Sequence, residues 1–491
     1  MHNKKSLTRK IEDHFKRFGL AYLLILTFLI LLEPFAYRNN FENDALIGTH
    51  SYYELRLSEK GTYEPYSNDQ MLLYGRPYQH SLSNPIFFIL STSMDSLTLA
   101  KLLPPVLGLL AVLLFYLILR KHKLSHTNRF FIITILVFSP LFIYLFTTFN
   151  PYQLVILFNL LGFYLFIQKG KFNLFLSLLA FSFTPFFGII PTLTLLAILF
   201  TYSSILREEK ARSFLIISAF LLLITLFIHV PFYNTYGFPE IPDLLERNVL
   251  QELISDLGGL QAYSTFSLLL ALIGFSSLWW SNKKNKPAYT IFLVMFFASL
   301  FYEGVPFYLN FFISIFAGFA LMALIKRKWQ LELIKTFTIL LLIYGVIFST
   351  ATYLVRLNTM DPNNELVESL EWLKENSEET DVVFSHYTNG FLIQAISDRR
   401  VLLDEKFDYI NQLERLYSDS ETILNSRNLK NTTSMMNKHS VSYIFITNKM
   451  KHELWRDEEE GLIFLFNDKD AFRKVYSNKE AEIWRFTNVT N

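Results

Sequence analysis

The sequence predicts a polytopic α-helical membrane protein with a C-terminal α/β domain. Of its 491 residues, 52% are hydrophobic and only 18% are charged, whereas average globular chains are about 25% charged. Apolar runs long enough to cross about 30 Å of hydrocarbon recur between Phe18 and Leu354. Residues 357–491 lack such runs and alternate instead between short apolar strands and amphipathic stretches.

The apolar runs predict about eleven transmembrane helices. Thr184-Pro185 divides the stretch 172–203, which is too long for one span, because proline breaks a helix. The expected spans are 18–36, 98–119, 129–148, 151–168, 172–183, 185–203, 213–233, 264–281, 287–302, 305–325 and 333–355.

Basic residues alternate between successive loops. Segments expected inside the cell hold 22 Lys and Arg, whereas those expected outside hold 5. Because cytoplasmic loops are enriched in Lys and Arg, we expect a multi-pass plasma-membrane protein with a cytoplasmic N-terminus and an extracytoplasmic C-terminal domain. The first span lacks a small-residue cleavage site, so we interpret it as an anchor and not as a signal peptide.

Two domains follow from this pattern. Residues 1–356 form a transmembrane domain with two long outer loops, 37–97 and 234–263, and residues 357–491 form the α/β domain. The second domain holds 16 basic and 24 acidic residues, which argues against nucleic acid as a partner because phosphate binding needs a basic face. Its expected helix is 364–377, and its expected strands are 381–385, 400–404, 441–447 and 481–486.

Composition also limits the chemistry. The chain has no cysteine, which excludes disulfides, thiolate zinc sites and a cysteine nucleophile. The span interiors are almost free of charge, with only Glu33 and His229 near outer ends. Transporters place ionisable groups at mid-membrane, so a transporter or flippase is disfavoured. The layout favours an enzyme that works at the outer interface on a lipid-linked substrate.

The segment GTHSYYELRL (48–57) is the strongest candidate site. In a helix, His50 and Glu54 lie one turn apart on one face and could bind a divalent metal or pass a proton. Arg56 could meet a phosphate, and Tyr52 and Tyr53 offer flat surfaces for a sugar or an isoprenoid. The alternative is that the His/Glu pair is only a surface contact.

These residues carry a resemblance to a known family. The first span followed by GTHSYYELRLSEKG resembles the start of GT-C membrane glycosyltransferases, most closely the prokaryotic oligosaccharyltransferase catalytic subunits, which carry a pattern like G-x-D-x-Y-Y-H-x-R. The likeness continues at 99–121 and 255–274. Residues 382–405 are similar to the strand-turn-helix that holds the acceptor-binding W-W-D-Y-G motif of that family.

The chain departs from the family pattern at three places. His50 stands at the acidic position and Glu54 at the histidine, so the two residue types are exchanged. The short turn 147–151 (TTFNP) offers only Asn150 where the family has a second acidic motif. The acceptor motif is reduced to HYTNG (386–390), without tryptophan. These departures argue against transfer to an Asn-x-Ser/Thr peptide, although the scaffold is kept.

The resemblance implies transfer of a sugar from a polyprenyl phosphate or diphosphate to a protein, glycan or lipid acceptor at the outer face of the bilayer. His50, Glu54 or Asp44 would act as the base, and Arg56, Arg76 or Arg247 would hold the donor phosphate. A divalent metal, Mg or Mn, stays open, with a metal-free mechanism favoured. The alternative is a catalytically degenerate relative that binds lipid-linked sugars or partner proteins. The acceptor-binding residues would be Tyr52, Tyr53, Glu303, His386, Tyr387 and Asn389.

Two expectations concern arrangement. Loop 37–83 should fold back onto the membrane surface, with the apolar stretch 84–91 at the interface because it is too short to span. The C-terminal domain should dock over the outer mouth of the bundle, so that Tyr387 to Phe391 face loops 37–83 and 234–263. Gly390 would permit a tight strand-to-helix turn; alternatively, Thr388 or Asn389 only caps a helix.

Overall fold

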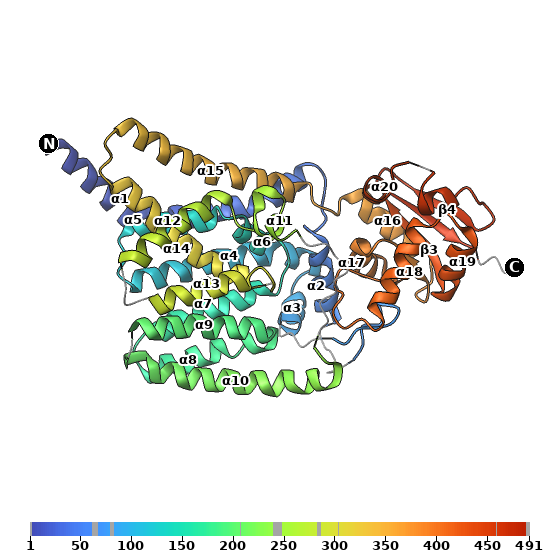
Figure 1. The fold of residues 1–491 in the computed structure, drawn as a ribbon, viewed down its shortest axis with the longest axis horizontal. Coiled ribbons are helices and arrows are strands. Elements are labelled where there is room, and N and C mark those ends of the chain that lie inside the picture. The colour runs from blue at the N-terminus through green and yellow to red at the C-terminus, as the bar shows by residue number, and fades with distance from the viewer. Residues whose placement is uncertain are drawn as a thin grey trace.

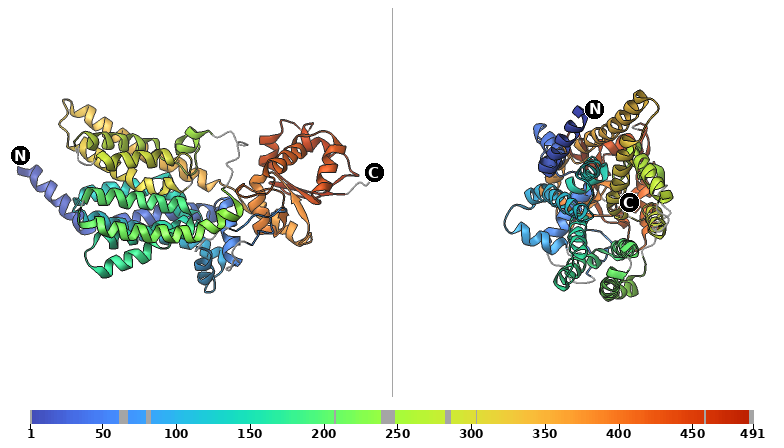
Figure 2. Two further views of the ribbon diagram at one scale, coloured as in Figure 1. Left: turned by 60° about the horizontal axis from the view of Figure 1, so that its bottom comes forward. Right: turned by 90° about the vertical axis from the view of Figure 1, so that its left-hand side faces the viewer.

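A helical bundle and a C-terminal α/β unit lie end to end along the long axis of the molecule (Figures 1 and 2). The structure is a computed structural model. Helices α2 and α3 and the short α17 lie where the two parts meet (Figure 1). The structure describes residues 2–60, 67–78, 83–206, 208–238, 248–281, 286–302, 304–457 and 459–487.

Each of the expected spans forms a helix or a broken helix pair. In the described part of the chain, α1, α4, α10, α14 and α15 are long and apolar enough to cross a membrane, and α5 with α6 forms a pair bent by 64°. The other apolar helices have 10–17 residues, and at 1.5 Å per residue they fall short of about 30 Å. The count of about eleven spans is therefore not confirmed. The bundle helices are α1 (His2–Asn40), α4 (Ser96–Lys121), α5 (His126–Val137), α6 (Pro140–Thr147), α7 (Tyr152–Ile167), α8 (Lys171–Phe181), α9 (Ile189–Leu206), α10 (Glu208–Tyr236), α12 (Thr265–Ser281), α13 (Lys286–Ala298), α14 (Val305–Lys326) and α15 (Glu332–Asn358).

Prolines and glycines shape the bundle. Pro140 follows the break between α5 and α6, and the Ser139 hydroxyl donates to Asn310 Oδ1 of α14 at 2.8 Å. The expected break at Thr184-Pro185 is confirmed, since the 3₁₀ turn Thr184–Phe187 separates α8 from α9. At Gly274 a Cβ would lie 2.0 Å from the carbonyl oxygen of Phe316, so only glycine allows α12 to approach α14 this closely.

The α/β unit contains a five-stranded mixed sheet in the order β2-β1-β3-β5-β4 among the described residues. β2, β1 and β3 are parallel, and β5 is antiparallel to both β3 and β4. The expected helix and four expected strands are present. Sequence reasoning missed β4, an edge strand with mostly exposed or half-buried side chains and no apolar alternation. The elements are α16 (Asn364–Glu375), β1 (Val382–Phe384), η4 (Tyr387–Asn389), α17 (Gly390–Leu392), η5 (Ile393–Ser397), β2 (Arg400–Val401), α18 (Leu413–Asn425), α19 (Leu429–Lys438), β3 (Val441–Thr447), α20 (Asn448–Leu454), α21 (Gly461–Leu465), β4 (Phe472–Ser477) and β5 (Ala481–Phe486).

The connection between bundle and α/β unit is held by the end of α1. The Arg38 guanidinium donates to the carbonyl oxygens of Met360, at 2.7 Å, and of Pro362. The backbone N–H of Gly48, directly before α2, donates to the Asp361 carbonyl at 3.1 Å. The segment that leads into the α/β unit is thus fixed against the start of the first outer loop.

The first outer loop packs between the two parts. It contains α2 (Thr49–Lys60), and α3 (Ser83–Ser91) follows it. Backbone hydrogen bonds join Met71 and Leu73 to Val401 of β2 at 3.0 and 2.9 Å, so the described part of the loop is no detached arm. Phe87 of α3 is buried against Phe149, whereas Ile89 is 67% exposed. Contact of this apolar face with the membrane stays a prediction.

Candidate functional site

Helix α2 is positioned by contacts at its start. Gly48 adopts a left-handed φ of +82° before the first residue of the helix. The Ser51 hydroxyl donates to the Ile47 carbonyl at 2.6 Å and accepts the backbone N–H of Phe149 at 3.0 Å. The second bond brings the turn 147–151 directly against α2.

His50 faces the α/β unit across the junction. Its Nε2 lies 3.2 Å from Oε2 of Glu405, and the Thr49 hydroxyl donates to the same oxygen at 3.1 Å. The His50 side chain is 50% exposed and that of Glu405 is 21% exposed. The pair is therefore open to solvent and could exchange a proton with a bound molecule.

Glu54 lies one turn further along α2 and is half-buried. Burial raises the pKa of its carboxyl, and the nearby positive charges of Lys406, His50 and Arg56 only partly oppose this shift. A carboxyl whose pKa lies above its ordinary range can act as a general acid or base close to neutral pH. Catalysis by His50 and Glu54, which lie one turn apart on α2, stays a prediction.

Arg56 is engaged by a carboxylate. Its Nη1 and Nη2 donate to the two oxygens of Asp69 at 2.9 and 2.6 Å, and both side chains are buried. Burial by itself raises the pKa of Asp69, but the Arg56 guanidinium outweighs it and brings this pKa to about 2. The pair stays ionised at neutral pH and fixes the loop after α2.

Arg76 is held in the same way by the α/β unit. It donates to both oxygens of Asp404 at 2.8 and 2.9 Å and to the carbonyl of Lys406 at 2.6 Å. Gln394 also donates to Asp404, at 3.0 Å. Binding of the donor phosphate by Arg56 or Arg76 stays a prediction. The geometry does not favour it, because each guanidinium already donates two hydrogen bonds to a carboxylate.

The remaining predicted base and charged residues lie elsewhere. Asp44 is 79% exposed and pairs with Lys101 of α4, while its backbone N–H donates to Asn364 Oδ1 at 3.0 Å. No described contact joins it to His50 or Glu54. Arg247 and Glu303 lie outside the described residues.

The two tyrosines of α2 are buried and make packing or hydrogen-bonding contacts near the junction with the α/β unit. Tyr52 is buried, and its hydroxyl accepts the backbone N–H of Leu46 at 3.2 Å. Tyr53 is also buried, and its ring centroid lies 4.5 Å from that of Phe391. Phe391 also contacts the His50 ring, at 5.1 Å. The expected approach of the 387–391 turn to the first outer loop is thus confirmed at Phe391.

The other members of the turn point into the α/β unit. Tyr387 packs against Phe407 at 5.1 Å between ring centroids. Asn389 is buried and donates to the Ser385 hydroxyl at 3.0 Å; it stands at the N-cap position of α17 but makes no capping bond there. Burial lowers the pKa of His386 to about 4, which keeps its imidazole neutral. Acceptor binding by these three residues stays a prediction.

Gly390 is needed for a different reason from the one expected. Its φ of −55° is helical, so no special turn requires glycine. A Cβ here would lie 2.6 Å from Asp404 Cβ and 2.7 Å from the Leu403 carbonyl oxygen. The missing side chain lets α17 approach the segment that carries Asp404, Glu405 and Lys406.

Sequence reasoning missed Glu405 and Lys406. The available signal was their position directly after the expected strand 400–404, since groups at the carboxyl ends of parallel strands commonly form binding sites. The strand in the structure, β2, ends earlier, at Val401. In the described part of the chain no three His, Asp or Glu side chains gather as metal ligands.

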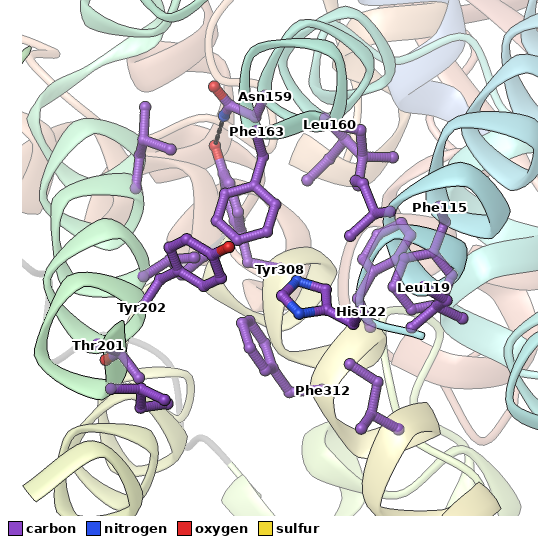
Figure 3. A pocket seen from close by; sticks show the side chains of 17 residues that line it. Phe115, Leu119, His122, Asn159, Leu160, Phe163, Thr201, Tyr202, Tyr308 and Phe312 are labelled. Atoms are coloured by element: carbon purple, nitrogen blue, oxygen red, sulfur yellow. Dashed lines mark hydrogen bonds between the residues drawn. The ribbon is translucent and has the colours of Figure 1, made fainter. Parts of the chain in front are cut away.

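An apolar pocket of about 210 Å³ lies in the bundle between α4, α7, α9 and α14 (Figure 3). Phe115, Phe163 and Phe312 are among its lining residues. At one end Asn159 donates to the Tyr308 hydroxyl at 2.9 Å. The pocket lies near the C-terminal end of α4. Lys101, which pairs with Asp44 of the segment before α2, lies near the other end of this helix. Its walls suit an apolar chain better than a sugar.

The bundle, α2 and the α/β unit together have the fold of solved oligosaccharyltransferase and ArnT structures, which confirms the fold expected from the resemblance to GT-C glycosyltransferases. Five of the described helices are long and apolar enough to cross a membrane. One similar structure is an Archaeoglobus fulgidus oligosaccharyltransferase with a tethered acceptor peptide containing the NVT sequon. The alignment covers 97% of this chain and 75% of the oligosaccharyltransferase chain, at 12% identity and a TM-score of 0.60. AglB from the same organism, in complex with an inhibitory peptide and a dolichol-phosphate, matches 96% and 74%, at 12% identity and a TM-score of 0.62.

ArnT from Cupriavidus metallidurans, bound to undecaprenyl phosphate, matches 96% of this chain and 98% of its own, at 12% identity and a TM-score of 0.52. Neither protein-family models nor curated protein sequences match this chain. The likeness therefore rests on the fold.

Proposed function

We propose that the protein moves a sugar or oligosaccharide from a polyprenyl-phosphate-type lipid to an acceptor at the extracytoplasmic face of the membrane. The observation that carries this proposal is the junction of α2 with the α/β unit, where His50 lies 3.2 Å from Glu405 and Glu54 has a raised pKa. The fold supports it, since solved structures of this fold hold dolichol-phosphate and undecaprenyl phosphate.

The proposed step uses Glu54 or His50 as the base. The acceptor nucleophile attacks the anomeric carbon, and its proton passes to the base. The bond between this carbon and the donor phosphate oxygen breaks, and the polyprenyl phosphate or diphosphate leaves with the bonding electrons. Glu54 is suited to the proton because burial destabilises its charged form, and the exposed His50 is suited to exchange that proton with water.

A second candidate is a catalytically degenerate relative that binds lipid-linked sugars or partner proteins. Two observations favour it. The turn against α2 offers Asn150, whose side-chain oxygen accepts the N–H of Tyr152 at 2.8 Å, and no carboxylate. The amide of Asn389 is used inside the α/β unit, so the acceptor turn presents few free polar groups.

A donor-consumption assay separates the two. Purified protein in lipid nanodiscs is incubated with radiolabelled lipid-linked sugars and a mixture of protein, glycan and lipid acceptors, and loss of label from the donor is followed. We expect consumption by the wild type and a loss of about 10²-fold or more for Glu54→Gln. Glu59→Gln, on an exposed position of the same helix, is the matched control. Donor binding without consumption would support the degenerate relative.

A further inference from the structure

The junction contains a cation that the sequence analysis did not assign. Lys406 comes from the α/β unit, and its Nζ lies 5.7 Å from the centre of the Tyr53 ring of α2. No ion pair joins this ammonium to a carboxylate among the described residues. The neighbouring Arg56 and Arg76, in contrast, each hold a carboxylate through two hydrogen bonds.

The backbone that carries Lys406 is fixed from both sides. Its N–H donates to Asp404 Oδ1 at 3.0 Å, and its carbonyl oxygen accepts a bond from Arg76 at 2.6 Å. Asp404 is in turn bound by Arg76 and Gln394. A side chain that starts from a fixed backbone loses less freedom when it binds an anion, which is the general advantage of preorganisation.

The electrostatic surroundings keep this ammonium charged. Burial alone would lower the pKa of Lys406, but the nearby Tyr53, Asp408 and Glu54 outweigh it and the pKa lies above its ordinary value. Glu405, the adjacent carboxylate, is already engaged by His50 and Thr49. The half-buried Lys406 is thus a cation held close to Glu54, and no carboxylate in the described part of the chain forms an ion pair with it.

We propose that Lys406 binds the phosphate of the lipid donor, so that the α/β unit supplies the cation and α2 supplies the base of one composite site. This inference rests on the proposed function. A lysine ammonium is a compact point charge that commonly binds phosphate, and it would stabilise the charge that develops on the leaving phosphate. In this arrangement Arg56 and Arg76 position the loop and the Lys406 backbone instead of touching the donor.

The test compares two ligands that share one chain. Binding of undecaprenyl phosphate and of undecaprenol to the full-length protein in nanodiscs is measured by native mass spectrometry or a radioligand assay. We expect Lys406→Gln to weaken undecaprenyl phosphate binding about tenfold or more and to leave undecaprenol binding unchanged. Lys406→Arg should restore most of the phosphate preference, and Lys430→Gln, an exposed position on α19, should behave like the wild type.

The outcomes separate the inference from the proposed function. If the wild type prefers the phosphate and Lys406→Gln keeps that preference, the assignment of Lys406 is wrong and the donor class stands. If the wild type binds the two ligands equally, both the assignment of Lys406 and the proposed class of lipid donor are wrong. Equal loss of undecaprenol and undecaprenyl phosphate binding in Lys406→Gln, with a lowered melting temperature, would show a structural role and overturn the inference.

Discussion

Glu54 lies in an environment that differs from that of an ordinary surface carboxyl. Burial raises the pKa of its carboxyl above 4.5, the ordinary value for glutamate. If the deprotonated form is the base, transfer activity must rise with pH through this raised pKa and fall as pH drops below it.

We therefore predict that the acid limb of the pH–rate profile lies above pH 4.5 and disappears in Glu54→Gln, whose remaining rate should be about 10²-fold or more lower. The rate of donor consumption as a function of pH checks this. An unchanged acid limb in Glu54→Gln would assign the base to another group, with His50 the first to examine.

Arg56 illustrates what the local sequence could not reveal. The sequence places it next to Tyr52, Tyr53 and Glu54, and this position suggests that Arg56 binds the donor phosphate. Its partner Asp69 lies in the loop beyond α2, and only the fold shows that both are buried and joined by two hydrogen bonds. A long polar loop carries no periodic signal that would predict such a pair.

Removing one member of this pair leaves an uncompensated buried charge. We predict that Arg56→Gln lowers the free energy of unfolding by about 3–5 kcal/mol, measured by thermal or denaturant unfolding in detergent. Arg415→Gln, exposed on α18, should change the free energy of unfolding little.

Because the pKa of Asp69 is depressed, the stabilisation by the Arg56–Asp69 pair should persist above the ordinary pKa of 3.8 and be lost as pH falls towards about 2. A stable Arg56→Gln protein with weakened donor binding would restore the phosphate role.

At the scale of elements, local signals predicted most of the helices and strands. Hydropathy runs marked the apolar helices because each run carries its own signal, and Pro185 marked a break. The number of true spans was less predictable, since several runs form helices too short by length alone. The pairing of the 71–73 segment with β2 joins residues more than 300 positions apart, which no local pattern encodes.

The approach of α17 to the 403–404 segment depends on Gly390. We predict that Gly390→Ala loosens the junction, because the added Cβ would lie 2.6–2.7 Å from Asp404 and Leu403 atoms, and backbone must move. Hydrogen exchange at 400–406 and 71–76 should increase, while exchange in β5 should stay unchanged. Equal exchange in the variant and the wild type would show that the junction accommodates a methyl group.

The topology of the whole molecule, with a cytoplasmic N-terminus and an extracytoplasmic α/β unit, is a prediction. The chain contains no cysteine, so single cysteines report accessibility without a background. We predict that an impermeant maleimide labels Glu379→Cys, exposed after α16, in sealed cells, and labels Lys328→Cys, exposed between α14 and α15, only after permeabilisation. The reverse pattern would place the α/β unit in the cytoplasm and contradict an extracytoplasmic site.

We expect the lipid donor to bind where α2 meets the α/β unit. A cryo-electron microscopy map of the full-length protein in nanodiscs with undecaprenyl phosphate tests it most directly. We predict phosphate density between Glu54 of α2 and the 404–406 segment, in contact with Lys406. Phosphate density elsewhere on the protein, with an empty junction, would contradict the account.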